Sequence, residues 1–203
     1  MIDKIVLASS NKGKLKEFGD IFKTWNVELI SQQLLNVSDA DETGLTFVEN
    51  AILKARHACQ VTGLPSLADD SGLEVDALKG APGIYSSRYS GNGDTANNEK
   101  LLAEMQGVPA DQRSARFRCL LVFMRHANDP TPLICQGTLE GSILDAATGE
   151  GGFGYDPIFQ IYPKLVNGQQ LSSAQLTPEQ KHAISHRGKA VADFVSQIES
   201  YLS

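Results

Sequence analysis

Two apolar segments near the start of the chain flank a helical stripe, and this arrangement constrains the fold more than any other feature. Residues 5–8 form a continuous apolar run, which predicts a buried strand. Residues 14–23 then carry apolar side chains at helical spacing, and residues 27–30 form a second apolar segment. The order of strand, turn, helix and strand indicates an α/β fold.

A capping box predicts where the next helix begins. Thr46 can accept a hydrogen bond from the backbone of Glu49, and the helix should continue to Gly63. A strand is then expected through residues 64–68. We expect this strand to end on the polar segment Asp69–Gly72.

The second half of the chain mixes strands, helices and glycine-rich loops. Pro178 lies where proline is favoured in the first turn of a short helix, and Ser185 can cap the last helix. The remaining expected elements are an extended segment at 73–75, a loop at 80–94, a helix at 97–105, an antiparallel strand pair at 115–124 and 132–139, and a loop at 149–157.

The composition excludes several classes of protein. The chain has 203 residues, of which 41% are hydrophobic and 21% charged, as in an ordinary soluble protein of one domain or two joined lobes. Its formal net charge of −6 does not suit a protein that coats a nucleic-acid backbone. A few cations focused in one place can still bind small phosphates.

The cysteines and the apolar runs predict a cytoplasmic protein. Cys59, Cys119 and Cys135 are widely spaced, so we expect free thiols in a reducing compartment. The apolar run at the N-terminus is too short for a signal peptide. The longest later run, residues 119–124, is far shorter than the roughly 20 residues that a membrane helix needs.

The turn after the first strand, residues 9–14, is a candidate phosphate site. The backbone amides and the dipole of the helix that follows favour an anion, and Lys12 and Lys14 add positive charge. The segment is not a Walker A loop, because its first glycine is missing and Leu15 replaces the Ser or Thr. The alternative is an ordinary turn with solvated lysines.

Two adjacent carboxylates, Asp69 and Asp70, follow the strand that is expected through residues 64–68. Their mutual repulsion favours a divalent cation, and Asp41 and Glu42 are available as partner acids. Mg²⁺ suits such a site, because it takes oxygen ligands and keeps water and phosphate oxygens around it. The alternative is a capping aspartate beside a turn aspartate.

The segment 149–154 formally matches GxGxxG, but no helix follows it and the βαβ context is missing, so we reject a dinucleotide site. We interpret it as a flexible loop that places Phe153 and Tyr155 against a planar ligand such as a base. The alternative is that both rings pack beside the core.

Three cationic or titratable side chains, Lys181, His186 and Arg187, gather at the start of the last helix. Arginine can form paired hydrogen bonds with a carbonyl or phosphate, and histidine can donate or accept. Solvated cations in a cap region are the alternative. No HExxH or GxSxG motif occurs, so protease and esterase functions are disfavoured.

Taken in order, these segments resemble the Ham1-type inosine triphosphate pyrophosphatases, which hydrolyse non-canonical purine nucleoside triphosphates. The departures are small: Ser9-Ser10 stands where the family often has Thr-Gly, and Asp41 where it often has Glu. The matching stretches cover nearly the whole chain and are residues 7–18, 42–55, 67–78, 80–89, 151–159 and 183–188.

The resemblance implies hydrolysis of ITP, dITP and XTP to the nucleoside monophosphate and pyrophosphate, with Mg²⁺ as cofactor. It implies an α/β fold with an elongated mixed β-sheet and flanking helices, in which residues 1–203 form a single domain with two lobes around a central cleft. It also implies a homodimer. The cellular role would be to keep deaminated purines out of DNA and RNA.

The resemblance also implies roles for particular residues. Asp70 would accept the proton of the attacking water, and Asp41, Glu42 and Asp70 would bind the metal. A hydrogen-bond donor such as Arg187 or a backbone amide would select the purine 6-carbonyl, Phe153 would stack on the base, and His186 would lie near its polar edge. The full set of expected substrate-binding residues is Ser9, Ser10, Asn11, Lys12, Gly13, Lys14, Lys54, Ser71, Phe153, Gly154, Tyr155, Asp156, Lys181, His186 and Arg187.

Two other functions remain open on the sequence alone. An enzyme of the related Maf type shares the opening motif, but it typically carries arginines after the first turn, where this chain has Asn11–Lys14. A non-catalytic nucleotide-binding module would tolerate loss of the acidic residues, which are all present here. Mg²⁺-dependent release of pyrophosphate distinguishes an enzyme from a binder.

Overall fold

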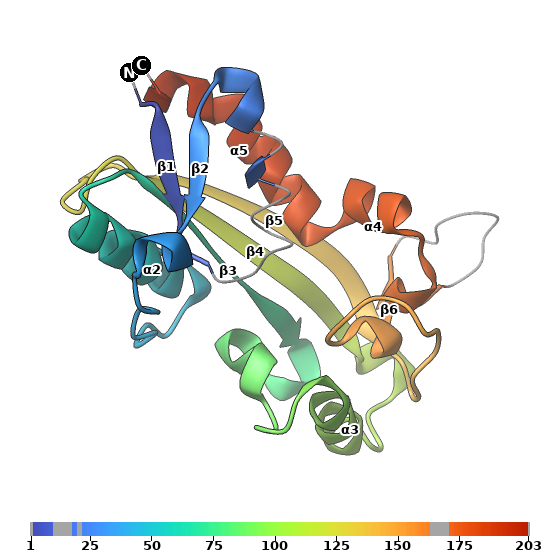
Figure 1. Ribbon diagram of the computed structural model, residues 1–203. Helices are drawn as coiled ribbons and strands as arrows, with labels where there is room; N and C mark the ends of the chain where they lie inside the picture. The colour runs from blue at the N-terminus through green and yellow to red at the C-terminus, as the bar shows by residue number, and fades with distance from the viewer. Residues whose placement is uncertain (1, 10–17, 20–21, 163–170, 203) are drawn as a thin grey trace. The chain divides into compact units, whose positions relative to one another are not determined.

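The strands form a mixed six-stranded sheet in the order β2-β1-β3-β4-β5-β6 (Figure 1). The computed structural model describes residues 2–9, 18–19, 22–162 and 171–202. β1 is parallel to β2 and β3, whereas β5 and β6 are antiparallel, so the α/β expectation is confirmed. The strands are β1 (Lys4–Leu7), β2 (Glu28–Ser31), β3 (Ser66–Val75), β4 (Ser114–Met124), β5 (Leu133–Ile143) and β6 (Phe159–Ile161).

The helices that follow Thr46 and Ser185 begin at the caps that the sequence predicts, whereas the helix expected at 97–105 begins earlier, at Asp94. The Thr46 hydroxyl accepts from the Glu49 amide at 3.3 Å, and the Ser185 hydroxyl accepts from the Gly188 amide at 2.9 Å. These bonds satisfy amides that have no partner within the first turn. The helices are α2 (Phe47–Thr62), α3 (Asp94–Glu104), α4 (Pro178–Ile184) and α5 (His186–Leu202).

Little of the predicted helix at 14–23 lies among the described residues. Within it, Phe18, Gly19 and Phe22 are helical, and both aromatic rings are fully buried. Leu15 and Ile21 lie outside the described residues. Of the helices in the described ranges, none combines the length and the apolar character that crossing a bilayer requires.

The chain divides into two compact units. Unit one comprises residues 1–70, 120–136 and 190–203, and unit two comprises residues 71–119 and 137–189. Strands β3, β4 and β5 each contribute residues to both units. The sequence-based view of residues 1–203 as a single domain with two lobes stays a prediction.

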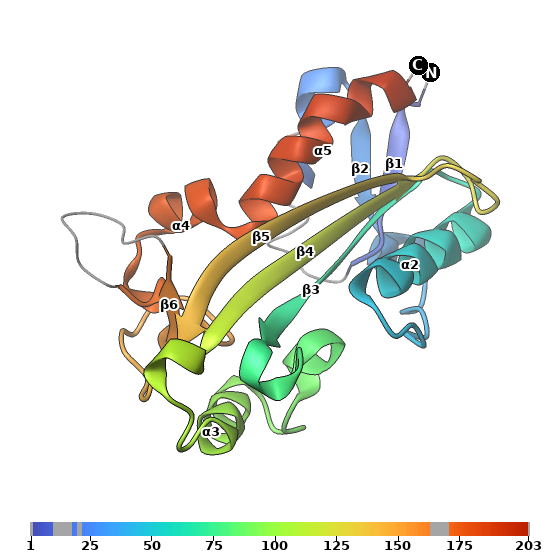
Figure 2. The same ribbon diagram turned by 180° about the vertical axis from the view of Figure 1, so that it is seen from behind.

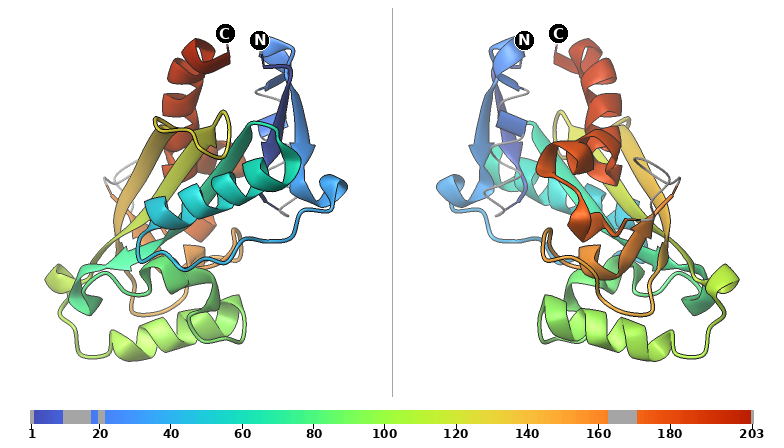
Figure 3. Two further views of the ribbon diagram at one scale, coloured as in Figure 1. Left: turned by 90° about the vertical axis from the view of Figure 1, so that its left-hand side faces the viewer. Right: turned by 90° about the vertical axis from the view of Figure 1, so that its right-hand side faces the viewer.

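In unit one, helices cover both faces of the strands (Figure 3). Val122 packs with the alanines of α2, whereas Phe123 meets Phe194 of α5 edge-on at 6.4 Å. Successive side chains of a strand point to opposite faces, so neighbours in β4 serve different helices. The three cysteines are free and buried, as expected, and burial raises the pKa of Cys135 to about 12.

In unit two, α3 and the ends of β3, β4 and β5 build a separate apolar cluster (Figure 2). Leu73, Leu101 and Phe159 are fully buried in it. The buried Arg113 donates to the carbonyl of Ile143 at 2.7 Å, and also to those of Leu144 and Met105. These bonds satisfy carbonyls that would otherwise be costly to bury.

The prediction that β3 ends on the polar segment Asp69–Gly72 is wrong, although residues 73–75 are extended as expected. The strand is continuous from Ser66 to Val75, so the two adjacent aspartates lie within it rather than at its end. β1 stops at Leu7, opposite Leu67, and β3 continues beyond this last pair. The polar interruption looks like a strand end in sequence, but Leu73 and Val75 resume the buried alternation in unit two.

Candidate active site

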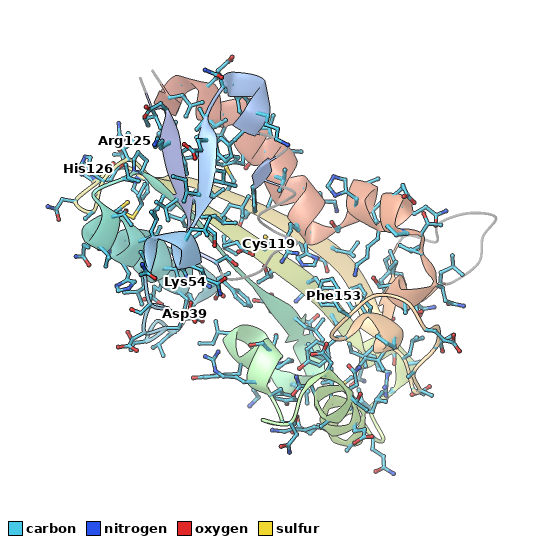
Figure 4. All side chains as sticks on the ribbon, in the orientation of Figure 1. Asp39, Lys54, Cys119, Arg125, His126 and Phe153 are labelled. Carbon is cyan, nitrogen blue, oxygen red and sulfur yellow. The ribbon has the colours of Figure 1, made fainter. Side chains whose placement is uncertain are left out.

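The charged cluster of unit one joins a helix, a strand and the acidic loop that precedes the helix. The ammonium of Lys54 on α2 lies 2.9 Å from Asp70 Oδ1 on β3 and 3.6 Å from Glu42 Oε1 (Figure 4). The side chains of Lys54 and Asp70 are only 16% and 13% exposed, so this pair is largely withdrawn from solvent. Such withdrawal strengthens each electrostatic interaction.

Burial and neighbouring charges perturb both members of this pair. Burial raises the pKa of Asp70, the Lys54 ammonium opposes that rise, and the negative charge of Glu42 adds to it. Burial by itself would lower the pKa of Lys54, but the charge and the hydrogen bond of Asp70, together with the charges of Asp69 and Glu42, outweigh it, and the net pKa is raised. Asp70 is therefore a stronger base than an exposed aspartate, and Lys54 stays protonated.

One oxygen of Asp70 is open to a ligand. Oδ2 is buried and has no hydrogen-bond partner among the described residues, although Oδ1 is held by Lys54. A buried carboxylate oxygen without a partner is costly, and a cation, a water or a substrate donor would satisfy it. Over the described ranges, no three His, Cys, Asp or Glu side chains converge as a metal site.

The loop that carries Glu42 is anchored to the first turns of α2. The amide of Gly44 donates to Asn50 Oδ1 at 2.9 Å, and the amide of Leu45 donates to Glu49 Oε2 at 2.9 Å. A Cβ atom on Gly44 would lie 2.6 Å from the Glu49 Cβ, so only glycine allows this close approach. Sequence reasoning missed Asn50. The structure shows it as a fully buried polar residue on the apolar face of α2.

The sequence left open whether Asp41 or Glu42 joins Asp70. The structure brings Glu42 to Lys54, and the charge of Glu42 acts on Asp70. Within the part of the chain that the structure describes, Asp41 contacts Thr43 through its backbone carbonyl, which accepts from the Thr43 amide at 3.0 Å. The geometry therefore favours Glu42.

Of the predicted phosphate turn, residues 9–14, Ser9 lies among the described residues. Ser9 follows β1 and is half-buried, and the amide of Ala8 before it donates to the Leu67 carbonyl at 2.8 Å. The remaining predicted ligands, Ser10, Asn11, Lys12, Gly13 and Lys14, lie outside the described residues. Ser71 adjoins Asp70 on β3 and is also half-buried.

An aromatic loop lies in unit two. Phe153 is 65% exposed, and the ammonium of Lys181 lies 4.3 Å from its ring centroid (Figure 4). Lys181 also forms an ion pair with the buried Asp156, which accepts a hydrogen bond from the Phe153 amide at 2.8 Å. The predicted residues Phe153, Asp156 and Lys181 therefore form one group around an exposed ring.

The prediction that Tyr155 presents its ring to a ligand is wrong. Its side chain is 4% exposed and belongs to the apolar core of unit two. Its hydroxyl donates to the Ser86 carbonyl at 2.8 Å, and burial raises its pKa. The two aromatic rings have separate roles, because the tyrosine anchors the loop whereas Phe153 remains accessible.

The start of α3 holds the aromatic loop from the other side. The amide of Gly154 donates to Asp94 Oδ2 at 2.9 Å, and Asn98 Nδ2 donates to the Gly154 carbonyl at 2.9 Å. Gly154 has φ of 60°, a left-handed conformation that favours glycine. Neither Asp94 nor Asn98 was among the predicted site residues. The signal for Asn98 is a pair of adjacent asparagines, Asn97 and Asn98, which are poor helix formers inside a helix.

His186 and Arg187 open α5. The His186 imidazole stacks on Phe117, with centroids 5.0 Å apart and planes 15° from parallel, so its orientation is set by the core of unit two. Arg187 is half-buried beside it. Both follow the capping Ser185, and they share unit two with Phe153 and Lys181.

Comparison with known proteins confirms the resemblance. The Ham1 family pattern matches residues 5–197. The dITP/XTP pyrophosphatase of Vibrio parahaemolyticus is 56% identical over 97% of both chains, and that of Photobacterium profundum is 57% identical over 94% of this chain and 95% of that one. The structure of a HAM1 protein from Coxiella burnetii has a TM-score of 0.91 at 45% identity, covering 98% of this chain and 100% of that chain. The chain therefore belongs to the Ham1 family.

Proposed function

We propose that this protein hydrolyses the non-canonical purine nucleoside triphosphates ITP, dITP and XTP to the nucleoside monophosphate and pyrophosphate. The observation that carries the proposal is the Lys54–Asp70–Glu42 cluster, in which one buried oxygen of Asp70 is open. The names of the curated relatives, dITP/XTP pyrophosphatase, support the same reaction. Such an enzyme removes deaminated purines from the nucleotide pool and keeps them out of DNA and RNA.

The reaction needs an activated water. The water oxygen attacks the α-phosphorus, the bond from that phosphorus to the oxygen bridging to the β-phosphate breaks, and pyrophosphate leaves. Asp70 accepts the proton of the water, and its raised pKa makes it a better base for that task than an exposed aspartate. Lys54 holds Asp70 Oδ1 and leaves Oδ2 for the water or the substrate.

Magnesium is the proposed cofactor. The open oxygen of Asp70 and the nearby carboxylate of Glu42 supply hard oxygen donors, which fit Mg²⁺. When bound, Mg²⁺ supplies positive charge that neutralises the triphosphate. The turn at 9–14, with Lys12 and Lys14, is proposed to bind phosphate oxygens through backbone amides and ammonium groups.

The residues of unit two are proposed to bind the base. The exposed ring of Phe153 offers a stacking surface, and Lys181 with Asp156 supports it. A donor such as Arg187 or a backbone amide would pair with the 6-carbonyl of hypoxanthine and would face a donor in adenine, with His186 near that edge. One mismatched contact of this kind gives roughly 10–100-fold discrimination.

We also propose that the protein is a cytoplasmic homodimer, as the family likeness implies. Size-exclusion chromatography with light scattering tests the dimer directly. A mass of twice the chain mass of 21.9 kDa supports it, and a single-chain mass contradicts it.

The test of the reaction is pyrophosphate release from ITP, dITP, XTP, GTP, ATP and dTTP, with and without Mg²⁺. We expect fast, Mg²⁺-dependent release from ITP, dITP and XTP, and its loss in Asp70→Asn. The matched control is Asp111→Asn, an exposed aspartate outside the cluster, which should retain full activity. A preference for dTTP would indicate a Maf-type enzyme, and binding without turnover would indicate a non-catalytic module.

A further inference from the structure

The exposed ring of Phe153 poses a physical problem. With 65% of the residue in solvent, burial of the side chain does little to hold it in place. The surrounding segment 149–154 contains four glycines. Each glycine has more backbone conformations available than another residue, so ordering this loop costs more conformational entropy. A ring that stacks on a base needs a defined orientation, so the loop must be held by some other interaction.

Side-chain hydrogen bonds to three backbone groups of Phe153 and Gly154 supply that restraint. The Phe153 amide donates to Asp156 Oδ2 at 2.8 Å, and the Gly154 amide donates to Asp94 Oδ2 at 2.9 Å. The Gly154 carbonyl then accepts from Asn98 Nδ2 at 2.9 Å. The peptide groups on both sides of Phe153 are therefore fixed, although the residue is 65% exposed and its ring meets only the Lys181 ammonium among the contacts described above.

Two of these three bonds come from α3, a regular helix whose apolar side packs in the core of unit two. Leu101, on the same helix, is fully buried. The neighbouring Asn97 ties the helix to a second loop, because its Oδ1 accepts from the Ser90 amide at 2.7 Å. The restraint on Gly154 thus originates in a rigid element rather than in another loop.

We propose that Asp94 and Asn98 are positioning residues that set the orientation of Phe153 through the backbone of Gly154. The inference rests on the proposed role of Phe153 in stacking on the purine base. Neither residue needs to touch the substrate. Their loss should weaken binding of the base without disturbing the Lys54–Asp70 chemistry, so KM should rise while kcat is largely preserved.

The first test is steady-state hydrolysis of ITP by the full-length enzyme with Mg²⁺. Asn98→Ala should raise KM by about 3–10-fold, the effect of one lost hydrogen bond, and should change kcat by less than about twofold. Asn98→Asp keeps the shape but replaces the donor with an acceptor, so its KM should rise at least as much. Glu99→Ala, an exposed change on the same helix, is the matched control and should behave as wild type.

Asp94 offers a conservative rescue. Asp94→Asn retains an oxygen that can accept from the Gly154 amide, whereas Asp94→Ala does not. We expect Asp94→Asn to stay within about twofold of the wild-type KM and Asp94→Ala to resemble Asn98→Ala. Equal defects in the two Asp94 variants would overturn the positioning role of this residue.

A double variant separates positioning from general stability. In a Phe153→Ala background, Asn98→Ala should have no further effect on KM, because the ring it orients is gone. The same fold-increase in both backgrounds would overturn the proposal, and so would a fall in kcat at unchanged KM. Thermal denaturation of each variant identifies any that fail to fold. If Asn98→Ala fails to fold, the comparison of KM between Asp94→Asn and Asp94→Ala tests the proposal.

Hydrogen exchange of the peptide spanning residues 150–155 gives a readout independent of catalysis. Exchange should be faster in Asn98→Ala than in wild type or Glu99→Ala. Unchanged exchange overturns the proposal even if the enzyme is active. If wild type hydrolyses none of the nucleotides but exchange still accelerates, the restraint on the loop stands and the proposed function fails.

Discussion

The two units hold their candidate functional groups in different ways. In unit one, Lys54 and Asp70 project from a helix and from the middle of a strand, and both are largely buried. In unit two, Phe153 lies on a glycine-rich loop and is mostly exposed. Charged groups that must keep perturbed pKa values need burial, whereas a stacking ring needs an accessible face. A helix and a strand supply the burial in unit one, and hydrogen bonds to the backbone hold the accessible ring in unit two.

Both units nonetheless use a helical asparagine to hold a loop by the backbone of a glycine. Asn50 accepts from the Gly44 amide, and Asn98 donates to the Gly154 carbonyl, each at 2.9 Å. Asn50 is fully buried, whereas Asn98 is half-buried. The loop held by Asn50 carries a carboxylate beside Asp70, and the loop held by Asn98 carries an aromatic ring. Loss of each should therefore affect a different kinetic parameter.

The largest effect should follow loss of the Lys54 ammonium. Lys54→Met leaves the carboxylates of Asp70 and Glu42 without their shared counter-charge, so activity on ITP should fall by about 100-fold or more. Lys4→Met, which breaks an exposed surface pair with Glu28, is the control and should remain active. Pyrophosphate release measures both, and a fully active Lys54→Met would remove this cluster from the mechanism.

A smaller loss of turnover should follow Asn50→Ala. The loop carrying Glu42 loses the bond that holds the Gly44 amide, so we expect kcat to fall by about 10-fold with KM little changed, the reverse of the pattern expected for Asn98→Ala. Steady-state kinetics with ITP measure the split, and Gln60→Ala, exposed on the same helix, is the control. If both asparagine variants alter the same parameter, the contrast between the two units fails.

The pH profile of kcat/KM tests the electrostatics of unit one. Asp70 must be deprotonated to act as a base, and its pKa is raised, so activity should fall at a higher pH than for an ordinary aspartate as the solution is acidified. Glu42→Gln removes a charge that raises this pKa, so its acidic limb should move to lower pH. Scaling each profile of kcat/KM to its own plateau isolates the shift in the pKa of the acidic limb. An acidic limb that moves to higher pH in Glu42→Gln contradicts the assignment of Asp70 as the base.

The smallest effect should come from Tyr155→Phe. Loss of the bond from its hydroxyl to the Ser86 carbonyl should lower the free energy of unfolding by about 0.5–1.5 kcal/mol and leave KM for ITP unchanged. Denaturant unfolding and steady-state kinetics measure the two quantities. A raised KM at unchanged stability would restore Tyr155 as a residue that contacts substrate.

Much of the fold was predictable because it depends on local patterns. The caps at Thr46 and Ser185, Pro178 in the first turn of α4 and the strand pair β4–β5 all follow from short-range spacing. Predictions of this kind succeed where the hydrogen bond or the apolar face lies within a few residues along the chain.

The end of β3 was not predictable in the same way. Two aspartates and a serine interrupt its apolar run, so the pattern predicts an end there and a separate extended segment at 73–75 rather than one continuous strand. The strand continues because Leu73 and Val75 fill a core built from β5, α3 and β6, which are distant in the chain. Asp94 and Asn98 were missed for the same reason, because their partner Gly154 is distant from them in the sequence.

The sequence by itself determined the α/β class, the family resemblance and most of the residues that carry charge or an aromatic ring. The tertiary structure decided which of them act together: Glu42 rather than Asp41 beside Lys54, and Phe153 rather than Tyr155 as the accessible ring. The physical reason is that periodicity and capping are local, whereas burial, pKa shifts and ion pairing depend on groups brought together from distant parts of the chain.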